Sequence, residues 1–166
     1  MKIGGIEVNG KVILAPMAGV TSLAYREFMK PFGVALSFSE MISDCGLYYN
    51  NKETFRYLKN SEVDHPLGLQ LFGSNTEISC KSVKILENNA NFEFLDLNLG
   101  CPVNKVTKTG AGSAWLKHPD EMYEYVRKIV TVSSHPVTAK IRLGWDDSSI
   151  NVDETSHLLQ EAGVSL

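Results

Sequence analysis

The most informative segment of this chain is Phe94-Leu95-Asp96-Leu97-Asn98-Leu99-Gly100-Cys101-Pro102. Residues 94–97 form a mostly apolar run, which predicts a buried strand. Gly100 and Pro102 are turn formers on either side of Cys101, so they predict a tightly fixed loop at the end of that strand. The thiol is then either held in place for chemistry or, like many free cysteines, a small apolar side chain that fills space.

Strand-like and helix-like segments alternate along the rest of the chain. The expected strands cover residues 12–15, 34–39, 66–72, 94–98 and 136–142, and residues 164–166 open a sixth. Helices are expected over residues 23–32, 48–58, 74–89 and 151–163, and from Pro119 onwards. Asn9-Gly10 predicts a tight turn in a small hairpin lid over residues 3–13.

Two of the expected helices have further signals in the sequence. In the helix over 23–32, one face carries Tyr25, Phe28, Met29 and Phe32. Ser74 and Glu77 have the spacing of a capping box, which makes Ser74 the expected N-cap of the helix over 74–89.

The repeated strand–helix order implies an α/β fold in which helices lie outside a parallel sheet. An open doubly wound sheet and a (β/α)8 barrel both fit this order. No Gly-x-Gly-x-x-Gly follows the first strand, which weakens the dinucleotide-binding open sheet. A complete barrel needs about 250 residues and this chain has 166. The prediction is therefore a (β/α)8 TIM barrel truncated after about five βα units, with no second domain within residues 1–166.

Composition limits the class of protein further. The chain is 43% hydrophobic and 21% charged, which is typical of a globular protein. No apolar run approaches the ~20 residues that cross a bilayer, and the N-terminus lacks the apolar core of a signal peptide. The three cysteines are widely spaced and odd in number, which favours a reducing, cytoplasmic location over a disulfide framework. No cysteine or histidine cluster suggests a metal site, so we expect none.

The net charge of −3 gives no overall attraction to nucleic acid, although a local basic patch can still supply one.

Polar residues gather where the expected strands end. They are Pro16-Met17-Ala18-Gly19, Glu40, Gln70, Asp96, Asn98, Lys140 and Arg142, with Cys101 just beyond. In a barrel, the carboxyl ends of the strands form the active site, and side chains two positions apart share a face. Two other interpretations stay open: Gln70 satisfies a buried backbone group, or Lys140 and Arg142 form interior ion pairs with Asp96 and Glu40.

Such a mouth suits flavin chemistry. A fixed cation at Lys140 would stabilise the negative charge of a reduced flavin. Gln70 both donates and accepts, which matches the polar edge of an isoalloxazine ring, and the backbone of residues 16–18 can lie against the ring. Cys101 would face the substrate, where a thiol with an ordinary pKa near 8.5 is mostly protonated at pH 7 and can donate a proton.

These residues resemble the tRNA-dihydrouridine synthases, in order and over essentially the whole chain. The resemblance rests on Ala15-Pro16-Met17-Ala18-Gly19-Val20-Thr21, Ser39-Glu40-Met41, Gln70-Leu71-Phe72-Gly73, Asn98-Leu99-Gly100-Cys101-Pro102, Lys105-Val106-x-Lys108-x-Gly110-Ala111-Gly112 and Lys140-Ile141-Arg142. The cysteine motif followed by the lysine- and glycine-rich loop is its most specific part.

The resemblance implies an FMN enzyme that reduces uridine in tRNA with NADPH as the hydride donor. Cys101 would then be the proton donor, and the FMN contacts would be Pro16, Met17, Ala18, Gln70 and Lys140. Asn98 and Arg142 would hold the uracil, which must be extruded from the stack to meet the flavin. Lys105 and Lys108 would touch tRNA phosphates, unless they belong to a solvated loop.

The chain also departs from the family pattern. Ser22 stands where an aspartate is common, Trp115 replaces an aliphatic residue, and the chain ends at Leu166, before the family's later strands and helical tRNA-binding domain. We therefore expect residues 1–166 alone to bind FMN weakly and not to turn over. The alternatives are a dihydroorotate-dehydrogenase-like flavin barrel that acts on a free pyrimidine, and a non-catalytic fragment.

Overall fold

A curled parallel sheet forms the centre of the computed structural model, which describes all 166 residues. Its strands run in the order β3–β4–β6–β7–β8, every neighbouring pair is parallel, and the short β5 pairs with β6. Their bounds are Val12–Leu14 (β3), Val34–Phe38 (β4), Ile42–Ser43 (β5), Leu67–Phe72 (β6), Phe94–Asn98 (β7) and Val137–Lys140 (β8).

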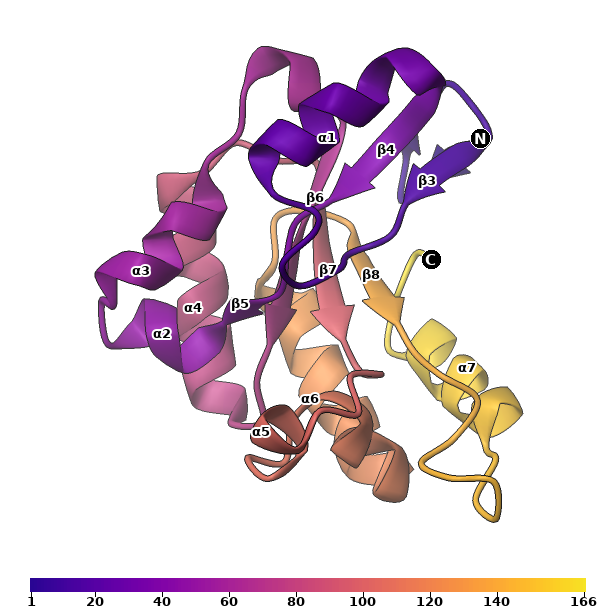
Figure 1. Ribbon diagram of the computed structural model, residues 1–166. Coiled ribbons are helices and arrows are strands. Elements are labelled where there is room, and N and C mark those ends of the chain that lie inside the picture. The colour runs from indigo at the N-terminus through magenta and orange to yellow at the C-terminus, as the bar shows by residue number, and fades with distance from the viewer.

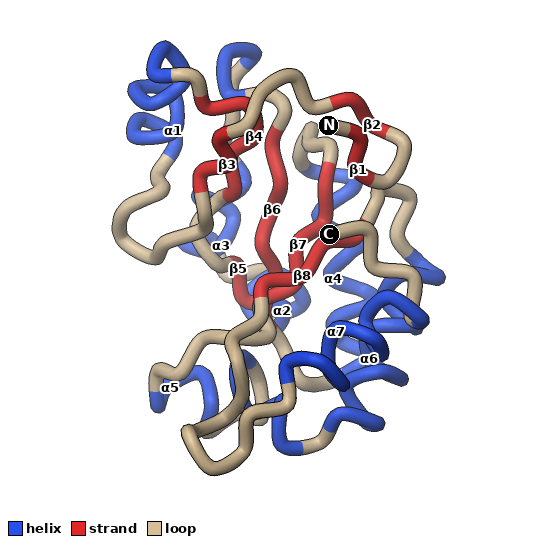
Figure 2. Tube along the Cα trace, turned by 90° about the vertical axis from the view of Figure 1, so that its right-hand side faces the viewer, coloured by secondary structure: helices blue, strands red, loops and turns tan.

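Helices lie outside the curl of the sheet (Figures 1 and 2). They are α1 (Leu23–Met29), α2 (Asp44–Tyr48), α3 (Lys52–Phe55), α4 (Thr76–Asn89), α5 (Asn104–Thr107), α6 (Pro119–Val132) and α7 (Val152–Glu161). Four 3₁₀ helices join them, over Lys30–Phe32, Arg56–Leu58, Glu62–Asp64 and Gly112–Lys117. No helix is long and apolar enough to cross a membrane.

Two apolar clusters hold the sheet. The larger one packs the outward side chains of the strands against the helices, and includes Leu69, Leu71, Leu95, Leu97, Met122, Val126 and Ile129. The smaller one lies against the other face and contains Ile3, Val8, Ala35, Leu36, Phe38 and Phe94. Because both faces are covered near the base of the strands, β4 and most of β6 and β7 are buried.

The N-terminal hairpin forms, but its turn is not the predicted one. β1 (Lys2–Ile3) pairs antiparallel with β2 (Ile6–Glu7), so Gly4-Gly5 makes the turn instead of Asn9-Gly10. Both glycines have positive φ, 51° and 90°, as a type I′ turn requires.

Two helix predictions also need correction. The N-cap of α4 is Asn75, whose side chain accepts from Ile78 N, while the Ser74 hydroxyl donates to Thr109 O. The helix expected over 48–58 is interrupted, because Asn50 adopts a positive φ of 55° and Asn51 caps a new helix, α3.

The face expected to be apolar on α1 is largely exposed. Phe28 and Phe32 are 65% and 66% exposed, whereas Arg26 is the buried residue of this helix. The reason is a buried carboxylate at Asp64 that takes the guanidinium.

The predicted α/β fold is confirmed as a parallel half-barrel sheet with outer helices. Residues 164–166 lie beside β8, joined by the bonds Ser165 N→Val137 O and Ala139 N→Leu166 O. Truncation of a (β/α)8 barrel after about five units stays a prediction.

Candidate active site

The carboxyl ends of β6, β7 and β8 open into one hollow of about 230 Å³. Its walls are Pro16, Ala18, Met41, Gln70, Asn98, Gly100, Cys101, Pro102, Val103 and Lys140. Six of the predicted site residues therefore meet here, and Gln70, Cys101 and Lys140 line the same cavity.

Strand register explains why these side chains converge. Gln70 on β6 lies opposite Asp96 on β7, which lies opposite Thr138 on β8. Two residues further along the strands, on the same face, Asn98 lies opposite Lys140. Because directly opposed residues in a sheet share a face, all five side chains are on the inner face of the curl.

A continuous series of hydrogen bonds runs across this inner face. Thr138 Oγ1 donates to Asp96 Oδ1 at 2.6 Å, and Gln70 Nε2 donates to Asp96 Oδ2 at 2.6 Å. Asn98 Nδ2 then donates to Gln70 Oε1 at 2.9 Å. The side chain of Gln70 is thus held between its two neighbours, while its backbone N–H donates to Ser39 Oγ. The alternative in which the Gln70 side chain satisfies a buried backbone group is therefore wrong, because its partners are Asp96 and Asn98.

The Cys101 loop is fixed by the end of this series. Asn98 Oδ1 accepts from Cys101 N at 3.0 Å and from Gly100 N at 3.3 Å. On the other side, Cys101 O accepts from Ser113 N at 3.0 Å. A Cβ at Gly112 would lie 2.6 Å from Cys101 O, and φ there is 62°. Glycine at 112 therefore lets the following segment support the loop closely.

The charges of the hollow are unequal in exposure. Asp96 is 3% exposed, and burial raises its pKa to about 6 despite bonds from Thr138 and Gln70 and the nearby charge of Lys140. Lys140 is exposed, and no ion pair joins it or Arg142 to Asp96 or Glu40. The predicted alternative of interior ion pairs is therefore wrong, and the Lys140 ammonium group has no carboxylate within ion-pair distance.

The loop after β3 is held from both sides. The Thr21 hydroxyl accepts from Met17 N at 3.0 Å and donates to Met17 O at 3.1 Å. A carboxylate oxygen of Glu40 accepts from Gly19 N, which ties this loop to the end of β4. Pro16 and Ala18 line the hollow, whereas the Met17 side chain is 40% exposed and does not.

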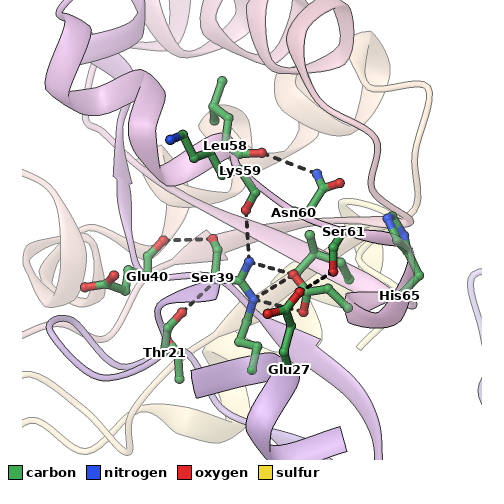
Figure 3. Close-up of polar contacts among 12 residues, drawn as sticks. Thr21, Glu27, Ser39, Glu40, Leu58, Lys59, Asn60, Ser61 and His65 are labelled. Atoms are coloured by element: carbon green, nitrogen blue, oxygen red, sulfur yellow. Dashed lines mark hydrogen bonds and ion pairs between the residues drawn. The ribbon is translucent and has the colours of Figure 1, made fainter. Parts of the chain in front are cut away.

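A buried ion pair supports this loop from behind. Arg26 Nη2 lies 2.6 Å from Asp64 Oδ2, and both side chains are almost fully buried. Arg26 also donates to Thr21 O at 2.8 Å and to Lys59 O at 3.2 Å. Figure 3 shows Thr21 and Lys59 around the Arg26–Asp64 ion pair. The ion pair therefore joins the loop after β3 to the segment that precedes β6. No local sequence pattern signals this pair, because Asp64 lies 38 positions after Arg26.

Besides Met17, three predicted residues lie outside the hollow. β8 ends at Lys140, so Arg142 is in the exposed segment that follows. Lys105 in α5 and Lys108 just after it are exposed on the segment behind Cys101.

Sequence reasoning gave no role to Trp115. Its Nε1 donates to Gly73 O at 3.0 Å, and its ring stacks on Tyr125 with centroids 4.5 Å apart. Trp115 thereby anchors the segment after the Cys101 loop to the end of β6.

The arrangement suits a planar ligand with a polar edge and negative charge. Lys140 supplies a positive charge. The Gln70 side-chain amide is held between Asp96 and Asn98, so its orientation towards a ligand is fixed. A thiol held by its backbone lies at the same opening, where it can transfer a proton to a second molecule. No group of three or more His, Cys, Asp or Glu is placed to hold a metal ion.

Several known proteins resemble this chain in sequence. The family model described as "Dihydrouridine synthase" matches residues 13–166. The "Probable tRNA-dihydrouridine synthase" of Treponema pallidum is 30% identical over 169 residues, covering 99% of this chain and 50% of the relative. The "tRNA-dihydrouridine synthase B" of Pasteurella multocida is 34% identical over 166 residues, covering 99% and 49%. The chain spans about half the length of the curated relatives it matches.

Proposed function

This chain belongs to the dihydrouridine synthase family, and from that membership we propose that the protein is an oxidoreductase that reduces uridine in tRNA to 5,6-dihydrouridine. One hydride and one proton add across the C5=C6 bond of uracil in this reaction. The observation that carries the proposal is the shared hollow of Gln70, Cys101 and Lys140.

FMN fits the residues of this hollow. Lys140 has no carboxylate partner and would hold the negatively charged edge of the ring, with Gln70 beside it. Pro16, Met17 and Ala18 would lie along the ring through their backbone. When bound, FMN supplies the hydride for uracil C6, and NADPH is the donor that restores it. Residues 1–166 would form the N-terminal portion of this flavin-binding barrel domain.

Cys101 supplies the proton in the proposed reaction. Its loop is held by Asn98 on one side and Ser113 on the other, so the sulfur has a defined position at the opening. The S–H bond breaks as the proton passes to uracil C5, and solvent then reprotonates the thiolate. Because the thiol is held beside the bound uracil, proton transfer does not depend on a collision with a donor from solution.

Asn98 and Arg142 would hold the extruded uracil. Asn98 lines the hollow, and Arg142 follows two residues after Lys140 in the exposed segment. Lys105 and Lys108 are exposed beside the Cys101 loop, where contact with tRNA phosphates would position the substrate. A cytoplasmic location belongs to the same proposal.

A direct test compares substrates with the full-length protein. Purified protein with FMN and NADPH is incubated with unmodified tRNA, free uracil or dihydroorotate, and the dihydrouridine content of the tRNA is measured. We expect reduction of tRNA uridine only. Turnover of a free pyrimidine in place of tRNA would instead support the dihydroorotate-dehydrogenase-like alternative.

A second measurement addresses the non-catalytic alternative and the truncation. The flavin absorbance of the full-length protein should show bound FMN, whereas residues 1–166 alone should bind it weakly and not turn over. A full-length protein that binds no flavin would favour a non-catalytic role. Sustained dihydrouridine formation by residues 1–166 alone would disprove the expected inactivity.

A further inference from the structure

Asp96 lies at the inner end of the hydrogen-bond series in the hollow. Its carboxylate is 3% exposed and accepts one bond of 2.6 Å at each oxygen, from Thr138 and from Gln70. An ionised carboxylate only accepts hydrogen bonds. Gln70 must therefore turn its NH₂ group towards Asp96 and its carbonyl oxygen away from it.

The direction set at Asp96 passes to the next residue. Because Gln70 Oε1 faces Asn98, Asn98 must present its NH₂ group to it, as the 2.9 Å bond shows. Asn98 Oδ1 is then left to accept from Cys101 N and Gly100 N. If both amides were reversed, the Asn98 NH₂ group would face the Cys101 N–H, and two donors would oppose each other.

We propose that Asp96 is a positioning residue, which fixes the Cys101 loop by setting the direction of the hydrogen bonds through Gln70 and Asn98. The same direction decides which of the Gln70 donor and acceptor atoms lies on each side of the hollow. The consequence for the reaction rests on the proposed function, whereas the effect on the Cys101 loop does not.

The test uses Asp96→Asn, an isosteric change that gives this position a donor. In a wild-type background asparagine can donate its NH₂ group to Thr138, whose hydroxyl then accepts where it now donates. The change is therefore made in a Thr138→Val background, where only Gln70 can accept from the NH₂ group and the series must reverse. We expect hydrogen–deuterium exchange at the Cys101 amide to be about tenfold faster in Asp96→Asn/Thr138→Val than in Thr138→Val, as loss of one hydrogen bond predicts. Exchange is measured by NMR under native conditions.

Two control variants separate direction from packing. Thr138→Val disturbs the same buried carboxylate but leaves the Gln70 bond to it, so exchange at Cys101 should stay as in the wild type. Asp44→Asn changes another buried carboxylate, which accepts from Ser79 Oγ and Cys45 N, and should affect exchange at Cys45 and not at Cys101. Equal exchange at Cys101 in Thr138→Val and in Asp96→Asn/Thr138→Val would overturn the proposal.

A double-mutant cycle supplies the catalytic readout. If Asp96 acts through Asn98, adding Asp96→Asn to Thr138→Val should lower kcat for tRNA reduction when Asn98 is present but not when Asn98→Ala is added. Additive losses would overturn the proposal. Should Asp96→Asn/Thr138→Val not fold, Gln70→Met interrupts the series one residue later and should accelerate exchange at Cys101 equally; unchanged exchange there would overturn it. A wild-type protein without tRNA activity would refute the proposed function while leaving the exchange test valid.

Discussion

Replacing Asp96 with asparagine will change how the stability of this protein depends on pH. Burial raises the pKa of Asp96 from 3.8 to about 6 in the folded chain. Between these two values the folded state binds more protons than the unfolded state, so the contribution of Asp96 to the free energy of unfolding falls as pH rises. Asparagine carries no titrating proton, and this contribution is absent from the variant.

The magnitude follows from the two pKa values. At about 1.36 kcal/mol per pKa unit, a rise from 3.8 to about 6 corresponds to about 3 kcal/mol of stability lost once Asp96 is fully ionised. Part of this loss of stability occurs below pH 4.5, where Asp96 of the unfolded chain is already largely ionised. About 2 kcal/mol of it lies between pH 4.5 and 7.5, the range in which the folded carboxyl gives up its proton.

Urea unfolding followed by circular dichroism measures this effect. The free energy of unfolding is determined for wild type and Asp96→Asn at pH 4.5, 5.5, 6.5 and 7.5, and the difference between the two proteins is compared across pH. Other titrating groups cancel in this difference. We expect it to shift by about 2 kcal/mol in favour of the variant as pH rises.

One result would refute the reasoning. If the difference between the two proteins stays constant from pH 4.5 to 7.5, Asp96 titrates alike in the folded and unfolded states, and its burial does not oppose ionisation.

Three further predictions concern single residues. Cys101→Ala should leave FMN binding and NADPH oxidation almost intact while slowing tRNA reduction by about 10²-fold or more, as loss of a general acid predicts; equal loss of all three in stopped-flow and binding assays would make Cys101 structural. Lys140→Met should weaken FMN binding and lower the flavin potential, because a cation that favours the reduced form is removed; an unchanged affinity and potential, by fluorescence and redox titration, would contradict this role. Arg26→Met leaves the buried Asp64 without its partner and should cost about 3–5 kcal/mol in urea unfolding, and Arg26→Met/Asp64→Leu should recover much of this loss; no recovery would show that Arg26 acts mainly through Thr21 O and Lys59 O.

Local patterns predicted the elements that build the site. β7 begins and ends at the predicted residues, Phe94 and Asn98, because an apolar run and a glycine-proline turn specify it within a few positions. Gln70, Cys101 and Lys140 were placed together by the rule that parallel strands end on the same side of a sheet. Register places Gln70 and Lys140 on the inner face, and the hydrogen bonds from Asn98 and Ser113 hold Cys101 beside them.

Long-range partners account for what the sequence did not reveal. Arg26 is buried on α1 because Asp64, 38 positions later, accepts from it, and no local pattern contains that pair. Arg142 was expected on a strand face, but β8 ends two residues earlier. At the start of α4, Ser74 and Asn75 are both good N-caps, and the choice fell to Asn75 because Ser74 bonds to the distant Thr109 O.

Gly112 imposes a constraint on anyone who would use this half-barrel as a scaffold. The site of a methyl group there is already filled by the Cys101 carbonyl and by Val106. Even alanine, the smallest replacement, would displace the loop around Cys101, which lies eleven positions upstream of Gly112. A mutant library that varies the residues lining the pocket should therefore keep glycine at position 112.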